Sequence, residues 1–294
     1  MTTENRAWRI LGHIVFAFFT VACILPFVLL IQASITDSQA IIRDGYSFFP
    51  SAYSLDAYRY LFQGSSGILR SYGITLFITV FGTVTSLLMS ALLAYPLSRR
   101  DYPARNPLAF IVFFTLLFNG GLVPTYLVYT QVFDMKNTIW ALIVPGLLMN
   151  GINVMLIRTY FLTSIPMPVI ESAKIDGAGE WRTFRSIVLP LSMPILATVG
   201  LFQTIAYWND WNNALIYLTD SKLYGIQPLL NRILMDAQFL ASNTSWGANM
   251  TNASAPLETV KMAIAVIGVV PMLLAYPFFQ KYFVKGIAVG AVKG

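Results

Sequence analysis

Charged side chains are scarce in this sequence. Asp, Glu, Lys and Arg make up 11% of the 294 residues, whereas soluble domains carry roughly a quarter. Hydrophobic residues make up 56%, and the mean hydropathy is +0.65. A deficit of charge this large argues against a soluble protein and indicates a chain whose solvent is largely a lipid bilayer.

Cysteine and histidine each occur once, which excludes several kinds of chemistry. Cys23 lies inside the first apolar segment, so neither a disulfide framework nor a cysteine metal site can form. His13 favours a structural or interfacial role. The sequence has no Gly-x-x-x-x-Gly-Lys-Ser/Thr phosphate loop, and its apolar segments contain no paired carboxylates, triad or metal cluster. An ATP-binding motor is therefore excluded, and a membrane-embedded enzyme fits poorly. The basic residues are not clustered with aromatics, so we expect no nucleic-acid partner.

Six stretches without a charged residue are long enough to cross the hydrocarbon core, which needs about 20 apolar residues. They cover residues 10–36, 71–98, 106–133, 137–157, 186–209 and 262–280. We therefore predict an all-α integral membrane protein with a single domain over residues 1–294. Its six transmembrane helices are predicted at about 11–33, 72–97, 108–132, 138–160, 187–208 and 260–280. Buried helices of a large soluble protein are the alternative, which six such stretches make improbable. Residues 237–257 are also uncharged but too rich in Asn, Ser and Thr to span.

Lysine and arginine set the predicted orientation, because short cytoplasmic loops are enriched in them. With the N-terminus in the cytoplasm, twelve of the 19 basic residues fall in cytoplasmic segments and seven in external ones. Both termini are therefore predicted to be cytoplasmic. Arg6 and Arg9 precede the first apolar segment as they would in a signal peptide. Its length and the lack of a small-residue cleavage site favour an uncleaved anchor.

Two interruptions of the apolar pattern are candidates for a substrate path. Asn119-Gly120-Gly121 and Pro124 should break the third predicted helix, and such backbone is tolerated only where protein or a water-filled cavity satisfies it. A second cluster combines aromatic faces with amides, which suits sugar binding: Tyr207, Trp208, Asn209 and Trp211. An interfacial aromatic belt explains that cluster equally well. The six segments contain no Asp or Glu, with which ion-coupled carriers usually bind their ions. We therefore expect a neutral, hydroxyl-rich solute.

The polar stretch over residues 163–185, between the fourth and fifth predicted spans, reads as a helix–turn–helix. Pro166 and Pro168 suit the first turn of a helix, where a missing N–H costs little. A helix over residues 169–175 would place Ile170 and Ala173 on one side.

A turn and a second helix are predicted to follow. Asp176-Gly177 favours the turn, because glycine tolerates a positive φ. The second helix would begin near Gly179, and Pro190 and Pro194 would set it at an angle to the fifth span. A face that mixes apolar groups with charges of both signs suits docking into a groove of another protein. A plain amphipathic surface helix is the alternative.

The spacing of residues in this loop resembles a known motif. Glu171-Ser172-Ala173, Gly177, Ile187 and Leu189-Pro190 follow the pattern of the EAA loop of ABC importer permeases. That pattern is Glu-Ala-Ala, three residues, Gly, nine residues, Ile, one residue, Leu-Pro. Ser172 is the one departure, and its small side chain should fit. The resemblance implies that this loop, including Asp176, couples an ATPase to the pore.

Two further segments are similar to the MalG-like, carbohydrate-uptake family of these permeases. Residues 286–294 resemble its Gly-rich C-terminal tail, which implies that Gly290, Lys293 and Gly294 reach the interface between two ATPases. A frayed terminus is the alternative. Phe118–Tyr126 resembles a segment of the oligosaccharide (LplC/YtcP-like) branch.

The resemblance covers nearly the whole chain and implies a permease subunit that does no chemistry itself. The subunit would form half of the translocation pore for a sugar or oligosaccharide, in a heterodimer with a second homologous permease. Two ATPase subunits would bind ATP and Mg²⁺, leaving no cofactor in this chain, and an extracytoplasmic substrate-binding protein would dock outside. The location would be the lipid of a bacterial plasma (inner) membrane. The alternatives are a secondary carrier or channel acting without ATP, and a membrane-embedded enzyme or scaffold.

Overall fold

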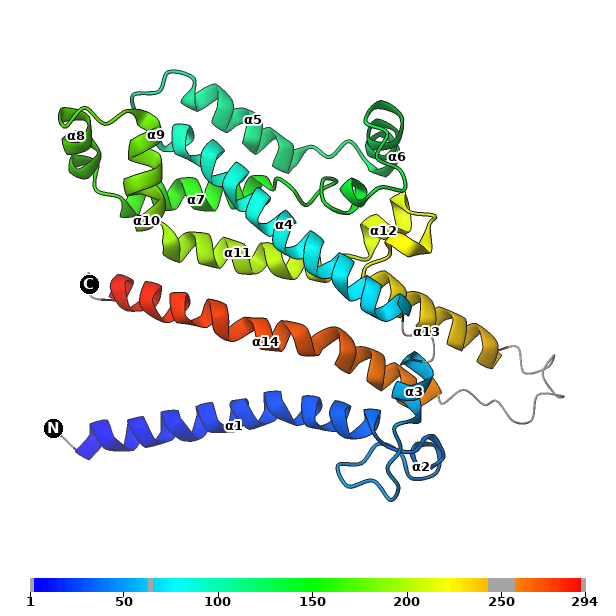
Figure 1. Ribbon diagram of the computed structural model, residues 1–294. Helices are drawn as coiled ribbons and strands as arrows, with labels where there is room; N and C mark the ends of the chain where they lie inside the picture. The colour runs from blue at the N-terminus through cyan, green and yellow to red at the C-terminus, as the bar shows by residue number, and fades with distance from the viewer. Residues whose placement is uncertain (1–2, 63–65, 243–256, 292–294) are drawn as a thin grey trace. The chain divides into compact units, whose positions relative to one another are not determined.

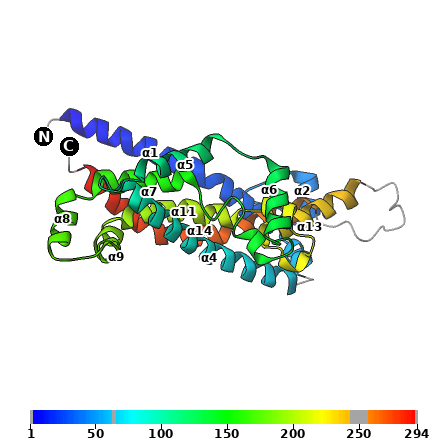
Figure 2. The same cartoon turned by 90° about the horizontal axis from the view of Figure 1, so that it is seen from above.

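The computed structural model describes residues 3–62, 66–242 and 257–291. These residues are nearly all helical, and they form no strand beyond one isolated bridge between Thr36 and Tyr53 (Figures 1 and 2). The chain divides into two compact units. The first contains residues 1–68 and 230–271, and the second contains residues 69–229 and 272–294.

The first unit contains α1 (Thr3–Ser34), α2 (Ser38–Asp44) and α3 (Asp56–Phe62), with most of α13 (Ile226–Ser242) and the first part of α14 (Leu257–Ala291). Asp37 caps α2, because its carboxylate accepts hydrogen bonds from the backbone N–H groups of residues 39 and 40. Tyr46 donates a hydrogen bond of 3.0 Å to Glu258, which ties the segment after α2 to the start of α14. Both α2 and α3 are short helices of seven residues that lie outside the predicted spans.

The second unit is built around α4 (Ser66–Ser98), α5 (Arg105–Leu117), α7 (Gly151–Ser164) and α11 (Met193–Trp208). A core cluster of this unit combines small residues of α4, such as Ala91 and Ala94, with branched residues such as Val154, Ile157 and Val199. Small side chains let helix backbones approach closely, which favours packing between apolar helices in lipid. In Figure 1, α4, α7 and α11 lie next to one another in this unit.

The predicted break of the third span is confirmed. Helix α5 ends at Leu117, and α6 (Leu122–Leu127) begins after Gly121, with the two helices bent by 115°. Gly121 has a φ of +84°, a conformation that glycine adopts without steric cost. The Asn119 side chain stabilises the bend by accepting a hydrogen bond of 2.9 Å from the Gly121 backbone N–H.

The predicted helix over residues 138–160 is wrong in its first half. Residues 139–142 form one 3₁₀ turn, the chain is then irregular to Asn150, and α7 begins at Gly151. Pro145 lacks a backbone N–H, and Gly146 has a φ of +70°, so neither fits a continuing helix. The side chain of Asn150 caps the new helix by accepting a hydrogen bond from the N–H of Ile152.

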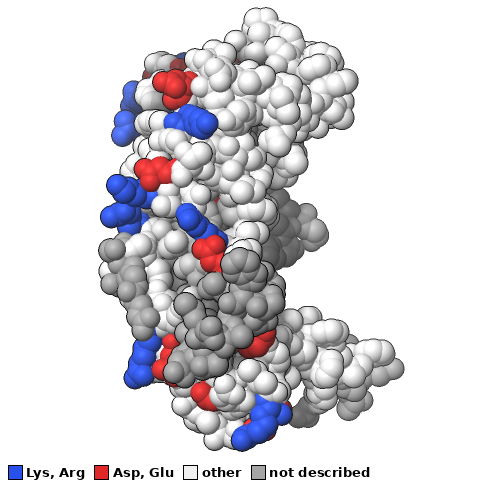
Figure 3. All heavy atoms as spheres, turned by 90° about the vertical axis from the view of Figure 1, so that its right-hand side faces the viewer, with Lys and Arg blue, Asp and Glu red and all other residues white. Residues whose placement is uncertain are grey.

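The other predicted spans correspond to helices, although their ends differ. Within the described part of the chain, three helices are long and apolar enough to cross a membrane, over residues 8–34, 67–98 and 258–277. Two bent pairs pass the same test, over residues 105–132 and 180–208. Helices α12 (Asn212–Tyr217) and α13 were not predicted. On the face drawn in Figure 3, acidic and basic side chains lie interspersed.

Candidate functional site

The first helix of the motif-bearing loop is α8 (Met167–Ile175), close to the expected range of 169–175. Pro166 is its extended N-cap residue and Pro168 lies in its first turn, as expected. The two residues predicted to share one side, Ile170 and Ala173, are both buried.

The turn after α8 requires a glycine because of its backbone. Gly177 has a φ of +73°, and a Cβ atom at this position would meet nothing within 4 Å. The Gly177 N–H donates to the carbonyl of Lys174, and the Ala178 N–H donates to the carbonyl of Ala173. These bonds close the turn and satisfy carbonyls at the helix end. Glycine is therefore required at position 177 by the backbone conformation, and not because a larger side chain would lack space.

The second half of the loop is a bent helix that leads into α11. It consists of α9 (Glu180–Thr183), a π-helical turn (Phe184–Val188) and α10 (Leu189–Leu191). The expected start near Gly179 is confirmed, since Gly179 is the residue before α9. The expected angle is also present, because this segment and α11 are bent by 77°. Among the motif residues, Ile187 and Leu189 are half-buried and Pro190 is exposed.

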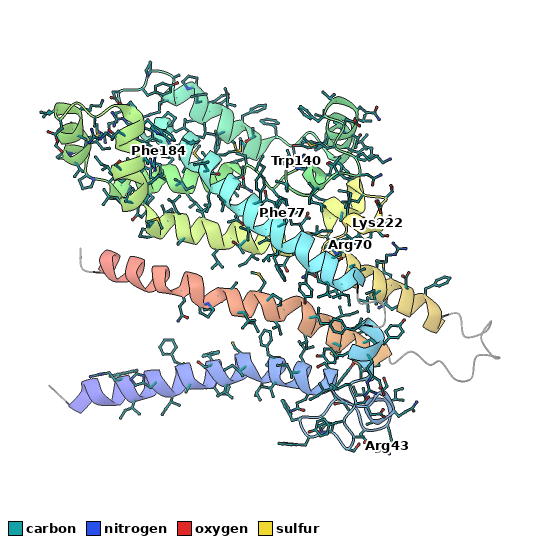
Figure 4. All side chains as sticks on the ribbon, viewed as in Figure 1. Arg43, Arg70, Phe77, Trp140, Phe184 and Lys222 are labelled. Carbon is teal, nitrogen blue, oxygen red and sulfur yellow. The ribbon has the colours of Figure 1, made fainter. Side chains whose placement is uncertain are left out.

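The inner face of the loop packs on the rest of the second unit through apolar side chains. Phe184 and Val188 join Ile170 in a cluster with residues of α4 and α7. The Phe184 ring lies 5.1 Å from that of Tyr95 on α4, measured between centroids, and Figure 4 shows Phe184 beside α9. The loop is therefore seated by burial of its apolar face.

The outer face of the loop mixes large apolar groups with charges. Ile175 is 87% exposed and Trp181 62% exposed. The motif residues Glu171, Ser172, Asp176 and Gly177 are exposed on the same loop, as are Arg182 and Arg185. Exposed aromatic and branched side chains rimmed by charges are typical of a surface that a partner covers.

A charged cluster lies where the loop meets the end of α4. Arg99 forms an ion pair of 2.9 Å with Asp101, and Lys174 forms one of 2.7 Å with the same carboxylate. Hydrogen bonds from Arg99 and Lys174 hold the pKa of the Asp101 carboxyl well below its usual range. The sequence reasoning missed this cluster, because Lys174 lies 73 positions after Asp101 in the chain.

The candidate substrate-path residues differ in how exposed their side chains are. Asn119, Asn209 and Trp211 are exposed. Tyr207 is fully buried and its hydroxyl donates a hydrogen bond of 2.9 Å to the carbonyl of Ile143, while Trp208 is 5% exposed. Only the exposed members have side chains that a solute could contact directly.

Polar side chains on and after α11 satisfy the irregular stretch between residues 143 and 150. Besides Tyr207, Gln203 donates to the carbonyl of Leu147, and Asn213 donates 3.0 Å to the carbonyl of Pro145. The oxygen of Gln203 accepts 3.0 Å from the amide of Asn153. Unpaired carbonyls are costly in an apolar interior, so these bonds allow the irregular backbone to exist there. Gln203 and Asn153 were visible in the sequence as polar residues within apolar segments.

The predicted ATPase-contacting tail is described only in part. Gly290 lies in the helical backbone of α14, which extends to Ala291. Lys293 and Gly294 lie outside the described residues. Within residues 3–62, 66–242 and 257–291, no group of three His, Cys, Asp or Glu side chains is placed to hold a metal ion.

Comparison with known proteins identifies the class to which this fold and loop belong. Residues 64–289 match the family model described as "Binding-protein-dependent transport system inner membrane component". The permease protein YtcP of a polygalacturonan/rhamnogalacturonan transport system of Bacillus subtilis (strain 168) is 41% identical over 99% of this chain and 100% of its own length. Protein LplC of the same strain is 40% identical over 92% of this chain and 90% of its own.

A solved structure supports the same conclusion. A chain of a bacterial ABC transporter involved in the import of the acidic polysaccharide alginate matches with a TM-score of 0.79 and 30% identity, over 96% of this chain and 99% of that one. The chain belongs to the family of inner membrane components of binding-protein-dependent transport systems. It is a permease subunit of an ABC importer, a transport component rather than an enzyme, and it works with ATPase and substrate-binding partners.

Proposed function

We propose that this permease forms half of the translocation pore for a sugar or oligosaccharide, and that ATPase subunits drive it through residues 165–191. The observation that carries the proposal is the outer face of α8 and α9, where Ile175 and Trp181 stand exposed among charged side chains. A second, homologous permease would complete the pore as a heterodimer, and one ATPase would dock on the loop of each permease. ATP and Mg²⁺ would be bound in the ATPases, and no cofactor would be needed here.

The proposed topology has six spans with both termini in the cytoplasm. Five spans correspond to the three long helices and the two bent pairs. The sixth would consist of the irregular stretch over residues 138–150 followed by α7. The hydrogen bonds from Gln203, Tyr207 and Asn213 support this assignment, because they satisfy carbonyls that lipid could not. The excess of Lys and Arg supports a cytoplasmic position for α8 and α9.

The proposed path for the solute uses the exposed polar groups. Asn119, Asn209 and Trp211 would line it, while Tyr207 and Trp208 would shape it from behind. The absence of Asp and Glu from the six charge-free stretches suits a hydroxyl-rich solute and no coupled cation. The names of YtcP and of the alginate transporter support a polysaccharide fragment as the solute. Should the sugar be acidic, loop arginines or the second permease would supply the opposite charge.

Uptake by the reconstituted complex tests the proposal. The chain would be expressed with its native neighbours, purified and placed in liposomes loaded with ATP. We expect an ATPase and a second permease to copurify, and uptake of oligosaccharides to continue when ionophores collapse the ion gradients. A complex whose ATPase carries a defective phosphate loop is the matched control and should not transport.

Two results would count against the proposal in different ways. Uptake driven by an ion gradient without ATP would refute ATP-driven import and favour a secondary carrier. Uptake of amino acids but of no sugar would keep the importer and remove the carbohydrate. A panel of neutral and acidic oligosaccharides would decide the charge of the solute.

A further inference from the structure

Two charged residues that follow α4 form a two-point ion pair. The Nε and Nη2 atoms of Arg99 lie 3.1 and 2.9 Å from the two carboxylate oxygens of Asp101. Such forked pairing fixes the orientation of both groups, because a single rotation would break both bonds. Asp101 is thereby held in one direction at the end of the helix.

Both halves of the loop bind to this pair. Lys174, in the last turn of α8, lies 2.7 Å from Asp101, and Glu180, the first residue of α9, lies 3.4 Å from Arg99. Lys174 and Glu180 are themselves 3.6 Å apart, and the hydroxyl of Tyr95 on α4 donates a hydrogen bond to Glu180. Four charges therefore connect the end of α4, the end of α8 and the start of α9.

Burial distinguishes this cluster from ordinary surface ion pairs, which contribute little. The Arg99 side chain is only 5% exposed, whereas the carboxylates of Asp101 and Glu180 are half-exposed. The Arg99 guanidinium also lies over the Tyr95 ring, 5.8 Å from its centroid. A buried cation is strongly destabilising without its anions, so Arg99 requires α9 and Asp101 to keep their positions.

Asp101 stays ionised in this cluster, and open space lies beside it. Because the pKa of Asp101 is held low, its ion pairs persist as the pH falls to the usual range of a carboxyl and below it, until the lowered pKa is reached. A cleft of about 460 Å³ is lined by Tyr95, Arg99, Asp101 and Glu180, among others. The charged groups are therefore not locked in a closed core.

We propose that Arg99, Asp101, Lys174 and Glu180 form an ionic latch, through which a displacement of α8 and α9 is transmitted to α4. The latch residues are positioning residues. The apolar inner face seats the loop, and the latch makes α4 follow it. The inference rests on the proposed role of the loop in docking an ATPase, and it adds the connection between that loop and the long helix α4.

Neutralising Asp101 in the complete complex tests the latch. The Asp101→Asn variant keeps the shape of the side chain and lies outside the proposed docking loop. We expect its ATPase to copurify and basal ATP hydrolysis to continue, while the amount of solute taken up per ATP hydrolysed falls about two- to tenfold. Asp101→Glu keeps the charge and should retain at least half of the normal ratio.

A matched control is provided by Asp44, which forms the same two-point pair with Arg43 at 2.7 and 2.8 Å, with both side chains exposed. Asp44→Asn should leave the uptake ratio unchanged. If Asp101→Asn does not assemble, Tyr95→Phe gives a second test from outside the docking loop, because it removes the hydrogen bond from α4 to Glu180. A drop in the ratio is again expected.

The outcomes separate the latch from the role of the loop. A second variant, Gly177→Leu, strains the turn after α8 and should block substrate-stimulated ATP hydrolysis if the loop docks an ATPase. An unchanged ratio in Asp101→Asn, with that hydrolysis blocked in Gly177→Leu, would overturn the latch and leave the loop function intact. Normal coupling in both variants would overturn the proposed loop function as well. A loss of copurifying ATPase or a lowered Tm, with a normal ratio in the complexes that remain, would reduce the cluster to a folding role and also overturn the proposal.

Discussion

The contact between Gly82 and Tyr207 provides a sharp test of how α4 and α11 pack. Tyr207 is fully buried, and a Cβ atom added at Gly82 would overlap its ring. The ring cannot swing away freely, because its hydroxyl donates a hydrogen bond of 2.9 Å to the carbonyl of Ile143. We therefore predict that Gly82→Ala forces either a helix displacement or the loss of this bond.

The magnitude follows from two costs. Overpacking a core by one methyl group typically costs about 1–3 kcal/mol. A hydrogen bond within a membrane protein contributes on average about 0.6 kcal/mol, so Tyr207→Phe should cost about 1 kcal/mol or less and Gly82→Ala about 2 kcal/mol. At roughly 2–4 °C per kcal/mol for a chain of this size, the Tm of the Gly82→Ala complex should fall by about 4–8 °C.

The assay is thermal unfolding of the purified complex, combined with uptake at varied solute concentration. Gly73→Ala on the same helix is the matched control, because a Cβ atom there would meet nothing within 4 Å. The double variant Gly82→Ala with Tyr207→Ala should lose less stability than the sum of its single variants, since the smaller side chain makes room for the methyl group. A Tyr207→Phe complex with a raised KM and an unchanged Tm would show that the hydroxyl binds solute, contrary to the structural role assigned to it.

Three further predictions concern the turn after α8, the membrane topology and the hydrogen bonds between Asn137 and Thr219. Gly177→Leu should leave membrane insertion intact but abolish substrate-stimulated ATP hydrolysis, because a left-handed backbone conformation costs a leucine about 1–2 kcal/mol. Gly177→Asn should be tolerated better. Full stimulation of hydrolysis in the leucine variant would contradict the role of the turn. In a variant without the native cysteine, a cysteine at Ser242 should react with an impermeant thiol reagent from outside and one at Ser172 should not; the opposite pattern would reverse the orientation. The side chain of Asn137, which has a φ of +55°, makes hydrogen bonds to both the backbone and the hydroxyl of Thr219. Asn137→Gly keeps that backbone but should lower stability by about 1–2 kcal/mol, and an unchanged Tm would show that these bonds contribute nothing.

Much of the loop could be predicted from the sequence, because local chemistry decides it. Proline at a helix start, glycine at a positive φ and two apolar residues three positions apart act through neighbouring backbone. Helix α8, its turn and the start of α9 were predicted correctly on these grounds. The break at Gly121 was predictable for the same reason. The long charge-free runs likewise predicted α1, α4 and α14, because an apolar segment in lipid must satisfy its backbone within a helix.

Tertiary structure decided the features that depend on partners far away in the chain. The hydropathy of residues 138–150 predicts a helix. Gln203, Tyr207 and Asn213 instead donate hydrogen bonds to backbone carbonyls of this stretch, which allows an irregular backbone there. The same packing buries Tyr207, which the sequence presents only as an aromatic residue beside amides. Arg99 and Glu180 meet across 81 positions, so no periodicity or motif relates them. Sequence patterns indicate which backbone conformations are permitted locally. Which of these conformations forms, and which charges pair, depends on the surfaces that the folded helices bring together.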